Sequence, residues 1–165
     1  MTRRELEITD PEEIRYILDH GLVLHLGLSD ENMPYVIPMN YGYEFKEMGK
    51  LVLYLHSSHV GHKLDVMRRN PMASFSIECD VHPFEGRVAC QYGMTYKSLF
   101  GRGSITFLTD TAHKEHAMQC LMKAQTGRGD FVFDERMLSI VTMMQIEVEE
   151  YTGKYRPLPE GLRRE

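Results

Sequence analysis

The sequence has few cysteines, no excess of basic residues and no long apolar run, and each absence excludes a class of protein. Its formal net charge of -5 argues against a general nucleic-acid or membrane-surface binder, because such proteins usually present a basic face. No segment approaches the roughly 18 apolar residues of a membrane span, and the first residues lack the apolar core of a secretory signal. We therefore expect a protein with neither a nucleic-acid nor a membrane partner.

The three cysteines are Cys79, Cys90 and Cys120, an odd number at wide spacing and without a C-x-x-C pair. This pattern predicts neither a disulfide framework nor a zinc site, and a reducing cytoplasm is the simplest compartment for it. A chain of 165 residues with 42% hydrophobic residues can bury one core. We expect a single domain over residues 1–156, followed by a polar tail over residues 157–165.

Strand patterns predominate along the chain. A first helix is predicted because Thr9 or Asp10 can cap it and Pro11 suits its first turn, and Gly21 ends it. The other predicted helices cover residues 60–70 and 111–125, and the six predicted strands cover residues 22–28, 35–45, 51–55, 73–78, 92–107 and 138–151. Pro38 cannot donate to a sheet ladder, so its strand should be irregular or lie at an edge there. Strands joined by short turns favour a mainly β (α+β) fold, a six-stranded antiparallel sheet closed into a small barrel with peripheral helices.

The segment over residues 53–71, LYLHSSHVGHKLDVMRRNP, has the features of a phosphate-binding strand–turn–helix unit. The first turn of its helix leaves backbone N–H donors free at a positive dipole end, which suits an anion. Gly61 lets an anion approach the backbone closely. Side-chain donors are available at four positions, Ser57, Ser58, His62 and Lys63. The same residues also fit an ordinary capped helix with a solvated lysine.

A metal site is an alternative for the same segment, because His56, His59 and His62 form an H-x-x-H-x-x-H series. Imidazole nitrogens bind zinc, but a strand that ends at His56 need not direct all three side chains to one point. No acidic residue joins them before Asp65. Spacing alone therefore leaves three hypotheses open: a phosphate site, a metal site and a plain helix cap.

The segment resembles the flavin-phosphate segment of the pyridoxamine-phosphate-oxidase-like split barrels. In that superfamily small polar residues end a strand, and a basic residue and a lysine open a helix that closes with Asn-Pro. The corresponding positions here are residues 56–58, 62–63 and 70–71. Two further stretches, VIPMNYGYE over residues 36–44 and YKSLFGRG over residues 96–103, resemble the nitroimidazole-resistance (Nim-type) branch. Three ordered motifs indicate an FMN-binding split barrel far more specifically than one motif does.

Two features depart from the family pattern. The basic residue before the lysine is often arginine in the oxidases, and here it is His62, which is only partly protonated near neutral pH. Its contact with a phosphate would then be weaker and pH-dependent. Residues 81–93 form an insertion that matches no motif, and it could be structural or could line a substrate space.

The resemblance implies site residues that are grouped by the part of FMN they would contact. Beside the flavin ring would run Pro38, Met39, Asn40 and Tyr41. The phosphate would be held by Ser57, His62 and Lys63. The partner subunit would contribute Tyr96 and Ser98, which would reach the flavin from across the interface. His56 would sit at the pocket mouth near the reactive face of the ring, where it could deliver a proton, orient the substrate or only pack against the flavin.

The leading hypothesis is a homodimer with FMN at its interface. It would be a flavin-dependent oxidoreductase of small organic substrates, with nitroaromatic compounds as candidates and NAD(P)H or another reductant as the electron donor. No metal is required by this hypothesis. One alternative is a flavin- or haem-binding carrier or sensor without its own turnover, with His56 as the haem ligand. The other is a metal-dependent enzyme built on the three histidines of the 56–62 series.

Overall fold

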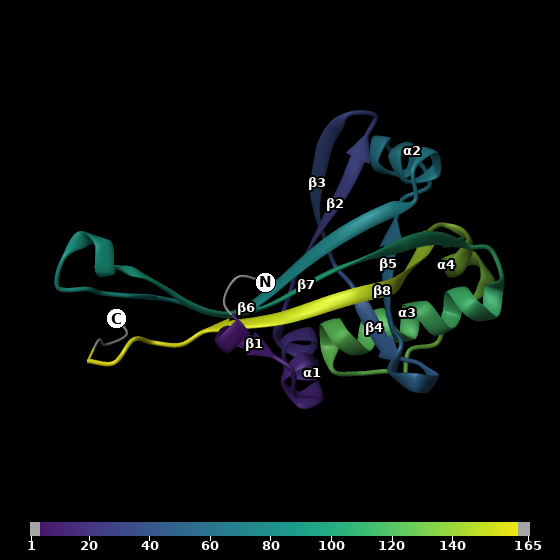
Figure 1. The fold of residues 1–165 in the computed structure, drawn as a ribbon. Helices are drawn as coiled ribbons and strands as arrows, with labels where there is room; N and C mark the ends of the chain where they lie inside the picture. The colour runs from purple at the N-terminus through teal and green to yellow at the C-terminus, as the bar shows by residue number, and fades with distance from the viewer. Residues whose placement is uncertain (1–3, 162–165) are drawn as a thin grey trace.

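The computed structural model describes residues 4–161, so residues 1–3 and the last four residues of the predicted polar tail lie outside the described part (Figure 1). The described residues form eight strands, four α-helices and three 3-10 helices. The strands are β1 (Glu7–Ile8), β2 (Leu24–Asp30), β3 (Met33–Met39), β4 (Gly42–Phe45), β5 (Leu51–Ser57), β6 (Met72–Phe84), β7 (Gly93–Leu108) and β8 (Thr142–Arg156). The helices are α1 (Pro11–His20), α2 (His62–Arg69), α3 (Thr111–Thr126) and α4 (Glu135–Ser139), with 3-10 turns at Arg4–Leu6, Glu47–Gly49 and Ala89–Gln91.

The predicted helices are confirmed, and α1 begins and ends where its sequence signals lie. The Asp10 carboxylate accepts a hydrogen bond from the Glu12 N–H at 3.0 Å, Pro11 opens the helix and Gly21 follows its last residue. This is the capping pattern that satisfies a free N–H at a helix start. No helix among residues 4–161 combines the length and the apolar composition needed to cross a membrane.

All the described strands belong to one antiparallel sheet in the order β3-β2-β6-β7-β8-β5-β4, and β1 pairs with β8. The predicted mainly β fold is confirmed, but the expected six strands are wrong, because residues 4–161 contain eight, and the sheet is not closed. The predicted strand over residues 35–45 is two strands, since β3 pairs with β2 and β4 pairs with β5. β1 has only two residues, which is too short to show a pattern.

The split in the barrel lies between β3 and β4. These strands are consecutive in sequence but stand at opposite ends of the strand order. Only Asn40 and Tyr41 separate them, a link that can span at most about 10 Å, so the two edges of the sheet must meet at this point. Pro38 lies on β3, an edge strand, as its missing N–H predicted.

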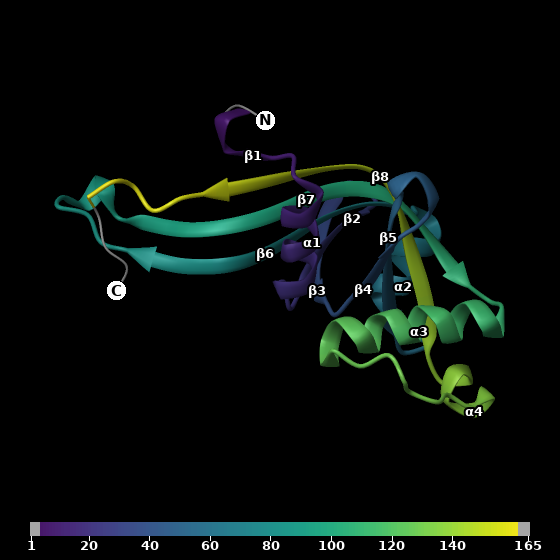
Figure 2. The same cartoon turned by 90° about the horizontal axis from the view of Figure 1, so that it is seen from below.

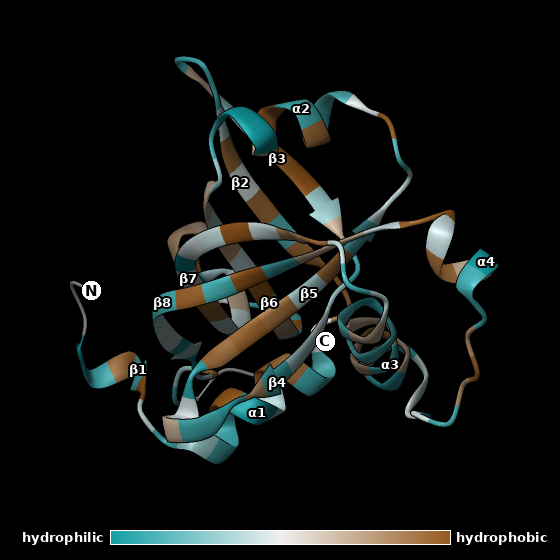
Figure 3. Ribbon diagram, turned by 90° about the vertical axis from the view of Figure 1, so that its right-hand side faces the viewer, coloured by the Kyte–Doolittle hydropathy of each residue, from teal (hydrophilic) through white to brown (hydrophobic). Residues whose placement is uncertain are grey.

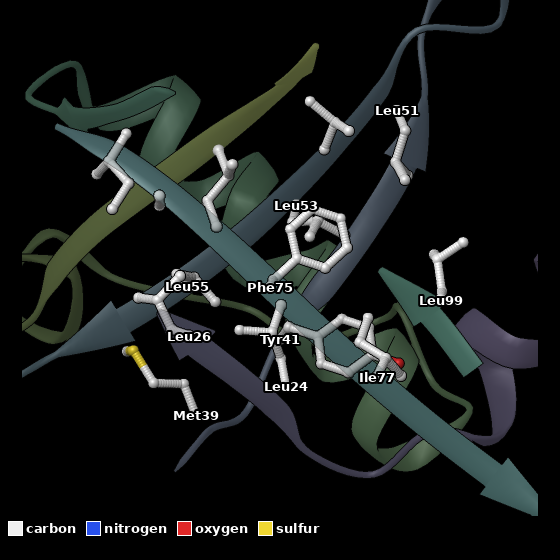
Figure 4. Close-up of a cluster of buried hydrophobic side chains, with 14 of the residues drawn as sticks. Leu24, Leu26, Met39, Tyr41, Leu51, Leu53, Leu55, Phe75, Ile77 and Leu99 are labelled. Atoms are coloured by element: carbon white, nitrogen blue, oxygen red, sulfur yellow. The ribbon is translucent and has the colours of Figure 1, made fainter. Parts of the chain in front are cut away.

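The barrel interior holds the main core, which Figure 4 shows in close-up. Strands β2, β5, β6 and β7 contribute Leu24, Leu53, Phe75, Ile77 and Leu99, each at most 1% exposed, and β8 and the helices α1 and α2 add further members. In Figure 3 apolar residues follow the central strands, while the outer sides of the helices are hydrophilic. β5 is buried on both faces, because its odd-numbered residues enter this core and its even-numbered residues lie beneath α3.

The far parts of β6, β7 and β8 leave the barrel as a long arm (Figures 1 and 2). The insertion over residues 81–93 forms the tip of this arm, where the Arg156 guanidinium lies 5.3 Å from the centre of the Phe84 ring. The insertion is therefore distant from β5 and α2 in the same chain.

The last predicted strand is partly wrong. Asp134 accepts a hydrogen bond from the Met137 N–H at 2.7 Å and caps the short helix α4, so Leu138 and Ser139 are helical. β8 begins only at Thr142. A short apolar run does not distinguish a helix from a strand by periodicity, and the cap decides between them here.

Candidate functional site

The end of β5 directs two polar side chains to opposite faces of the sheet. Successive strand residues alternate in direction, so Ser57 shares the barrel-interior face and His56 shares the face beneath α3. Ser57 is 5% exposed. The Ser57 Oγ and the His56 Nδ1 are buried and have no hydrogen-bond partner in the described part of the chain. A buried polar atom without a partner is costly, which makes both atoms candidates for contact with a ligand.

The first turn of α2 follows four residues after Ser57 and offers free backbone donors. No side chain caps it, and its cap residue Gly61 has φ +147° and ψ 150°, a conformation that only glycine adopts readily. A Cβ at this position would meet no atom within 4 Å, so the backbone is open to a ligand. The uncapped N–H groups and the positive end of the helix suit an anion.

His62 is engaged by a carboxylate. Its Nε2 lies 2.6 Å from Asp30 Oδ2, and Arg69 Nη2 lies 2.5 Å from the other carboxylate oxygen. The hydrogen bond from His62, together with Arg69, lowers the pKa of the Asp30 carboxyl. These pairs attach α2 to the end of β2. Because the His62 ring already contacts Asp30, an anion at the start of α2 would meet the His62 backbone N–H and not its ring.

The electrostatic environment of His56 is set by burial and by Lys63. Burial and the positive charge of Lys63 both lower the pKa of His56, so the imidazole is neutral at neutral pH. Lys63 is half-buried at the second position of α2. The positive charge of Lys63 therefore acts on the His56 imidazole.

The structure does not support the metal site that was the alternative for the three histidines. His59 contacts the Thr142 hydroxyl at 3.1 Å and the Ser139 carbonyl at 2.6 Å, and His62 contacts Asp30. The ring nitrogens of His59 and His62 therefore have separate partners. Among residues 4–161 they do not gather as ligands within reach of one ion.

The four residues expected beside the flavin ring alternate in direction. Met39 is 6% exposed and Tyr41 is 1% exposed, and both side chains belong to the core. The Tyr41 hydroxyl donates to the Leu18 and Gly21 carbonyls. Met39 and Tyr41 could therefore contact a ligand only through their backbones, and the Tyr41 carbonyl already accepts a hydrogen bond from Gln125 Nε2 at 3.4 Å.

Pro38 and Asn40 point away from the core and are exposed. The Asn40 side-chain amide donates to Gln125 Oε1 at 3.1 Å, which ties the β3–β4 link to the end of α3. Ligand contact through the Asn40 side chain would have to break or share that bond.

Tyr96 and Ser98 lie far from the β5–α2 junction in the same chain. Ser57 pairs with Thr142 at the start of β8, whereas Ser98 pairs with Lys154 near its end. These two β8 positions are twelve apart in sequence, which corresponds to up to about 40 Å of strand. The structure therefore does not bring Tyr96 and Ser98 together with Ser57 within one chain.

A second polar cluster, formed by Glu44, His116 and Cys120, was not found from the sequence. Their ligand atoms lie within 4.8 Å of one another. The His116 side chain is 55% exposed, and its Nε2 contacts Glu44 Oε2 at 2.9 Å. The i, i+4 spacing of His116 and Cys120 was the only sequence signal. The third member, Glu44, comes from a distant strand, β4.

Burial and hydrogen bonding shift the pKa values in this cluster. Burial alone would raise the pKa of Glu44, but hydrogen bonds from Tyr54 and His116 lower it overall. Burial, together with the Glu44 charge, raises the pKa of the Cys120 thiol to about 11. The cluster borders a cavity of about 840 Å³ between α1, β4 and α3.

Comparisons with known proteins agree with this architecture. A family model described as pyridoxamine 5'-phosphate oxidase matches residues 10–155. A candidate 5-nitroimidazole antibiotic resistance protein from Bacteroides thetaiotaomicron is 29% identical with a TM-score of 0.77, over 91% of this chain and 86% of that one. No curated protein matches the sequence.

Two more distant structures share the fold. The FAD and heme binding protein from Mycobacterium smegmatis is 15% identical with a TM-score of 0.78, over 96% of this chain and 83% of that one. The flavocytochrome Anf3 from Azotobacter vinelandii is 17% identical with a TM-score of 0.74, over 94% of this chain and 71% of that one.

Proposed function

This chain belongs to the pyridoxamine 5'-phosphate oxidase family, and we propose that it binds FMN and acts as a flavin-dependent oxidoreductase of small organic substrates. The observation that carries the proposal is the buried Ser57 Oγ without a partner in the described part of the chain, with only four residues between Ser57 and the uncapped first turn of α2. The two similar structures above that are described as flavin proteins add support.

The phosphate would be held by donors of three kinds. Ser57 supplies a hydroxyl, the first turn of α2 supplies backbone N–H groups, and Lys63 supplies a charged ammonium. Gly61 leaves the space above the backbone open. The His62 ring is occupied by Asp30, so we assign to this residue a backbone contact in place of the predicted side-chain contact.

The flavin, when bound, supplies the electron-transfer chemistry. The residues of the chain position it and its substrate. His56 is neutral and half-buried, and its Nδ1 can either donate or accept one hydrogen bond. We assign to His56 the orientation of the substrate or a proton transfer at Nδ1, and to the Pro38–Tyr41 backbone the edge of the ring.

Two copies of the chain would complete each site. Tyr96 and Ser98 are too distant to contact a flavin bound at Ser57 of the same chain, so a second copy would have to bring them. Their surroundings suit such a contact, because Phe100 is 45% exposed and Tyr151 is 38% exposed beside them. A groove of about 380 Å³ runs along this surface. We therefore propose a homodimer with shared sites.

The absorbance spectrum of the purified protein is the first test. The proposal expects flavin bands and, after release, FMN in a ratio of about one per chain. Reduction of the bound flavin by NAD(P)H, followed by reoxidation with a nitroaromatic compound, would support the oxidoreductase. Protein that neither retains nor rebinds FMN would overturn the proposal.

A mixed dimer tests whether the sites are shared. Lys63→Ala removes the proposed contact with the flavin phosphate, and Tyr96→Ala removes the proposed contact that the partner subunit would make with the same flavin. If sites are shared, a dimer with one chain of each variant has one intact site and recovers about half the flavin of the wild-type dimer. If each chain holds its own site, the mixed dimer binds no more flavin than either variant alone. Light scattering of the same samples reports the oligomeric state.

A haem- or flavin-binding carrier without turnover is the second candidate. It is favoured by the two similar structures described as a flavocytochrome and as a FAD and heme binding protein. The free Nδ1 of His56 would then serve as the haem ligand. A Soret band that is lost in His56→Ala would select this candidate, and a flavin spectrum without one would reject it.

A further inference from the structure

We propose that Glu44, His116 and Cys120 form a binding site for a divalent, borderline-soft metal ion of the Zn²⁺ type. This site lies between β4 and α3, apart from the β5–α2 junction, and does not depend on the flavin proposal. Glutamate oxygen, imidazole nitrogen and thiolate sulfur are all zinc ligands, and three protein ligands with an open fourth position form a complete coordination set with water.

The spacing of the donor atoms suits one ion. Donors around a tetrahedral zinc lie about 3.3–3.7 Å apart, given metal–ligand bonds of about 2.0–2.3 Å. The Cys120 Sγ lies 3.7 Å from the His116 Nε2. The Glu44 Oε2 lies 2.9 Å from the same nitrogen, so this pair has to separate by only about half an ångström to admit the ion in place of the shared proton.

The backbone holds these donors together. His116 and Cys120 are four residues apart on α3 and thus share one helix face. Gly42, two residues before Glu44, packs directly against the helix, because a Cβ there would lie 2.3 Å from the Leu121 nitrogen. The absence of a side chain at Gly42 brings β4 close enough for Glu44 to reach the helix.

Contacts from the Tyr54 side chain orient two of the ligands. The Tyr54 hydroxyl donates to Glu44 Oε1, which leaves the other carboxylate oxygen directed at His116. The Tyr54 ring also meets the His116 ring edge-on, with 5.8 Å between the ring centres. Outer contacts of this kind fix the orientation of metal-binding side chains in known sites.

The open position of the ion would face solvent. Glu44 and His116 line both the cavity of about 840 Å³ and a second hollow of about 400 Å³ on the other side, toward β7 and β8. Water or a small anionic ligand could therefore occupy the fourth position. The site is not a closed structural zinc site, in which the protein supplies all four ligands.

Metal titration of untagged, reduced protein tests the proposal. Calorimetry with Zn²⁺ should give one ion per chain, and Co²⁺ should give a tetrahedral spectrum with a thiolate-to-metal band. Cys120→Ser should abolish that band, and His116→Ala should weaken Zn²⁺ binding by about 100-fold or more, beyond the 10–100-fold typical of outer-shell changes. Tyr54→Phe, an outer-shell change, should weaken it about tenfold.

Two variants serve as matched controls. His113→Ala removes a histidine of the same helix whose side chain is 77% exposed, and Cys90→Ser removes an exposed thiol. Both should bind Zn²⁺ as the wild type does. Absence of stoichiometric binding, or binding that survives both His116→Ala and Cys120→Ser, would overturn the proposal. Equal losses in the two controls would overturn it as well.

A measurement on the wild-type protein covers the case in which a variant does not fold. Bound Zn²⁺ should slow alkylation of Cys120 by iodoacetamide at least about tenfold, as quantified by peptide mass mapping, because the metal holds the thiolate. Cys90 is exposed and serves as the internal reference. Equal alkylation rates with and without Zn²⁺ would contradict the proposal.

Discussion

The β5–α2 junction and the β4–α3 cluster differ in how the chain assembles them. The junction is local, because its polar groups lie within residues 56–63. The cluster joins Glu44 to His116, which are 72 positions apart in sequence. Spacing along a chain shows the first kind of site and hides the second, because the second exists only after β4 packs against α3.

The two regions also differ in charge. At the junction, burial and the positive charge of Lys63 lower the pKa of His56, and the N-terminus of α2 adds the positive end of a helix dipole. In the cluster, the Glu44 carboxylate faces the His116 imidazole, and burial together with the Glu44 charge raises the pKa of the Cys120 thiol. The first arrangement suits an anion and the second suits a cation. An anionic ligand should therefore bind at the junction, and a cation should bind at the cluster.

The largest expected effect tests whether the two regions are structurally independent. Leu64 on α2 is 0% exposed and Leu121 on α3 is 4% exposed, so Leu64→Ala and Leu121→Ala should each lower the free energy of unfolding by about 2–5 kcal/mol. Urea denaturation measures the loss, with Leu22→Ala, at a site 75% exposed, as the control. At low denaturant, Leu64→Ala should reduce flavin binding and leave Zn²⁺ binding unchanged. A joint loss of both ligands would mean that the regions are coupled.

The next effect concerns the anion alone. Lys63→Ala should weaken FMN binding by about 1.5–3 kcal/mol, which is the contribution of a charge-assisted hydrogen bond. Fluorescence titration of the apoprotein with FMN measures it. Lys123→Ala is the matched control, because Lys123 lines the cavity beside Cys120 and should leave flavin affinity unchanged. Unchanged FMN affinity in Lys63→Ala would contradict the assignment of Lys63 to the FMN phosphate.

A backbone change should have a somewhat smaller effect. Gly61→Ala forces a side chain into φ +147°, at a cost of about 1–3 kcal/mol, and should also hinder the approach of a phosphate. Gly129→Ala is the control, because its φ is not in the left-handed region and its nearest contact is 3.9 Å. Thermal unfolding measures both variants. Similar melting temperatures for the two would show that the turn adapts without strain.

The smallest effect is the pH dependence of stability. His56 has a pKa below its ordinary value of 6.5, so below that value the unfolded chain binds more protons and stability falls as the pH falls. His56→Gln should flatten this slope. Glu44, whose pKa is also lowered, contributes stability that is present above 4.5 and is lost at lower pH. Urea denaturation from pH 4 to 8 separates the loss of stability below pH 6.5, due to His56, from the loss below pH 4.5, due to Glu44. Identical stability profiles for the wild type and His56→Gln would contradict a lowered pKa for His56.

Much of the fold could be predicted from the sequence. Asp10, Pro11 and Gly21 are local signals that mark α1, and the residues 92–107 predict β7 within one position at each end. The strand count was wrong because residues 35–45 change pairing partner from β2 to β5, and pairing is a tertiary property. No local pattern records such a change.

The candidate site was predicted unevenly for the same reason. Ser57 and Lys63 follow from a contiguous motif and lie beside the uncapped helix start. The Asp30–His62 pair was not predicted, because Asp30 lies on a strand 32 positions earlier. The core positions of Met39 and Tyr41 were also hidden, since alternation in β3 can be assigned only when its buried face is known.

The central place of β8 has a consequence for how the protein is made. β8 is the last of the described strands, yet it lies between β7 and β5 and pairs with both of them, as in the pair of Val52 and Glu147. During synthesis, β5 and β7 must therefore wait with unpaired edges until the ribosome has delivered nearly the whole domain. Exposed edges of this kind promote aggregation. Expression of this protein should therefore depend on chaperones and on temperature more than its small size alone would require.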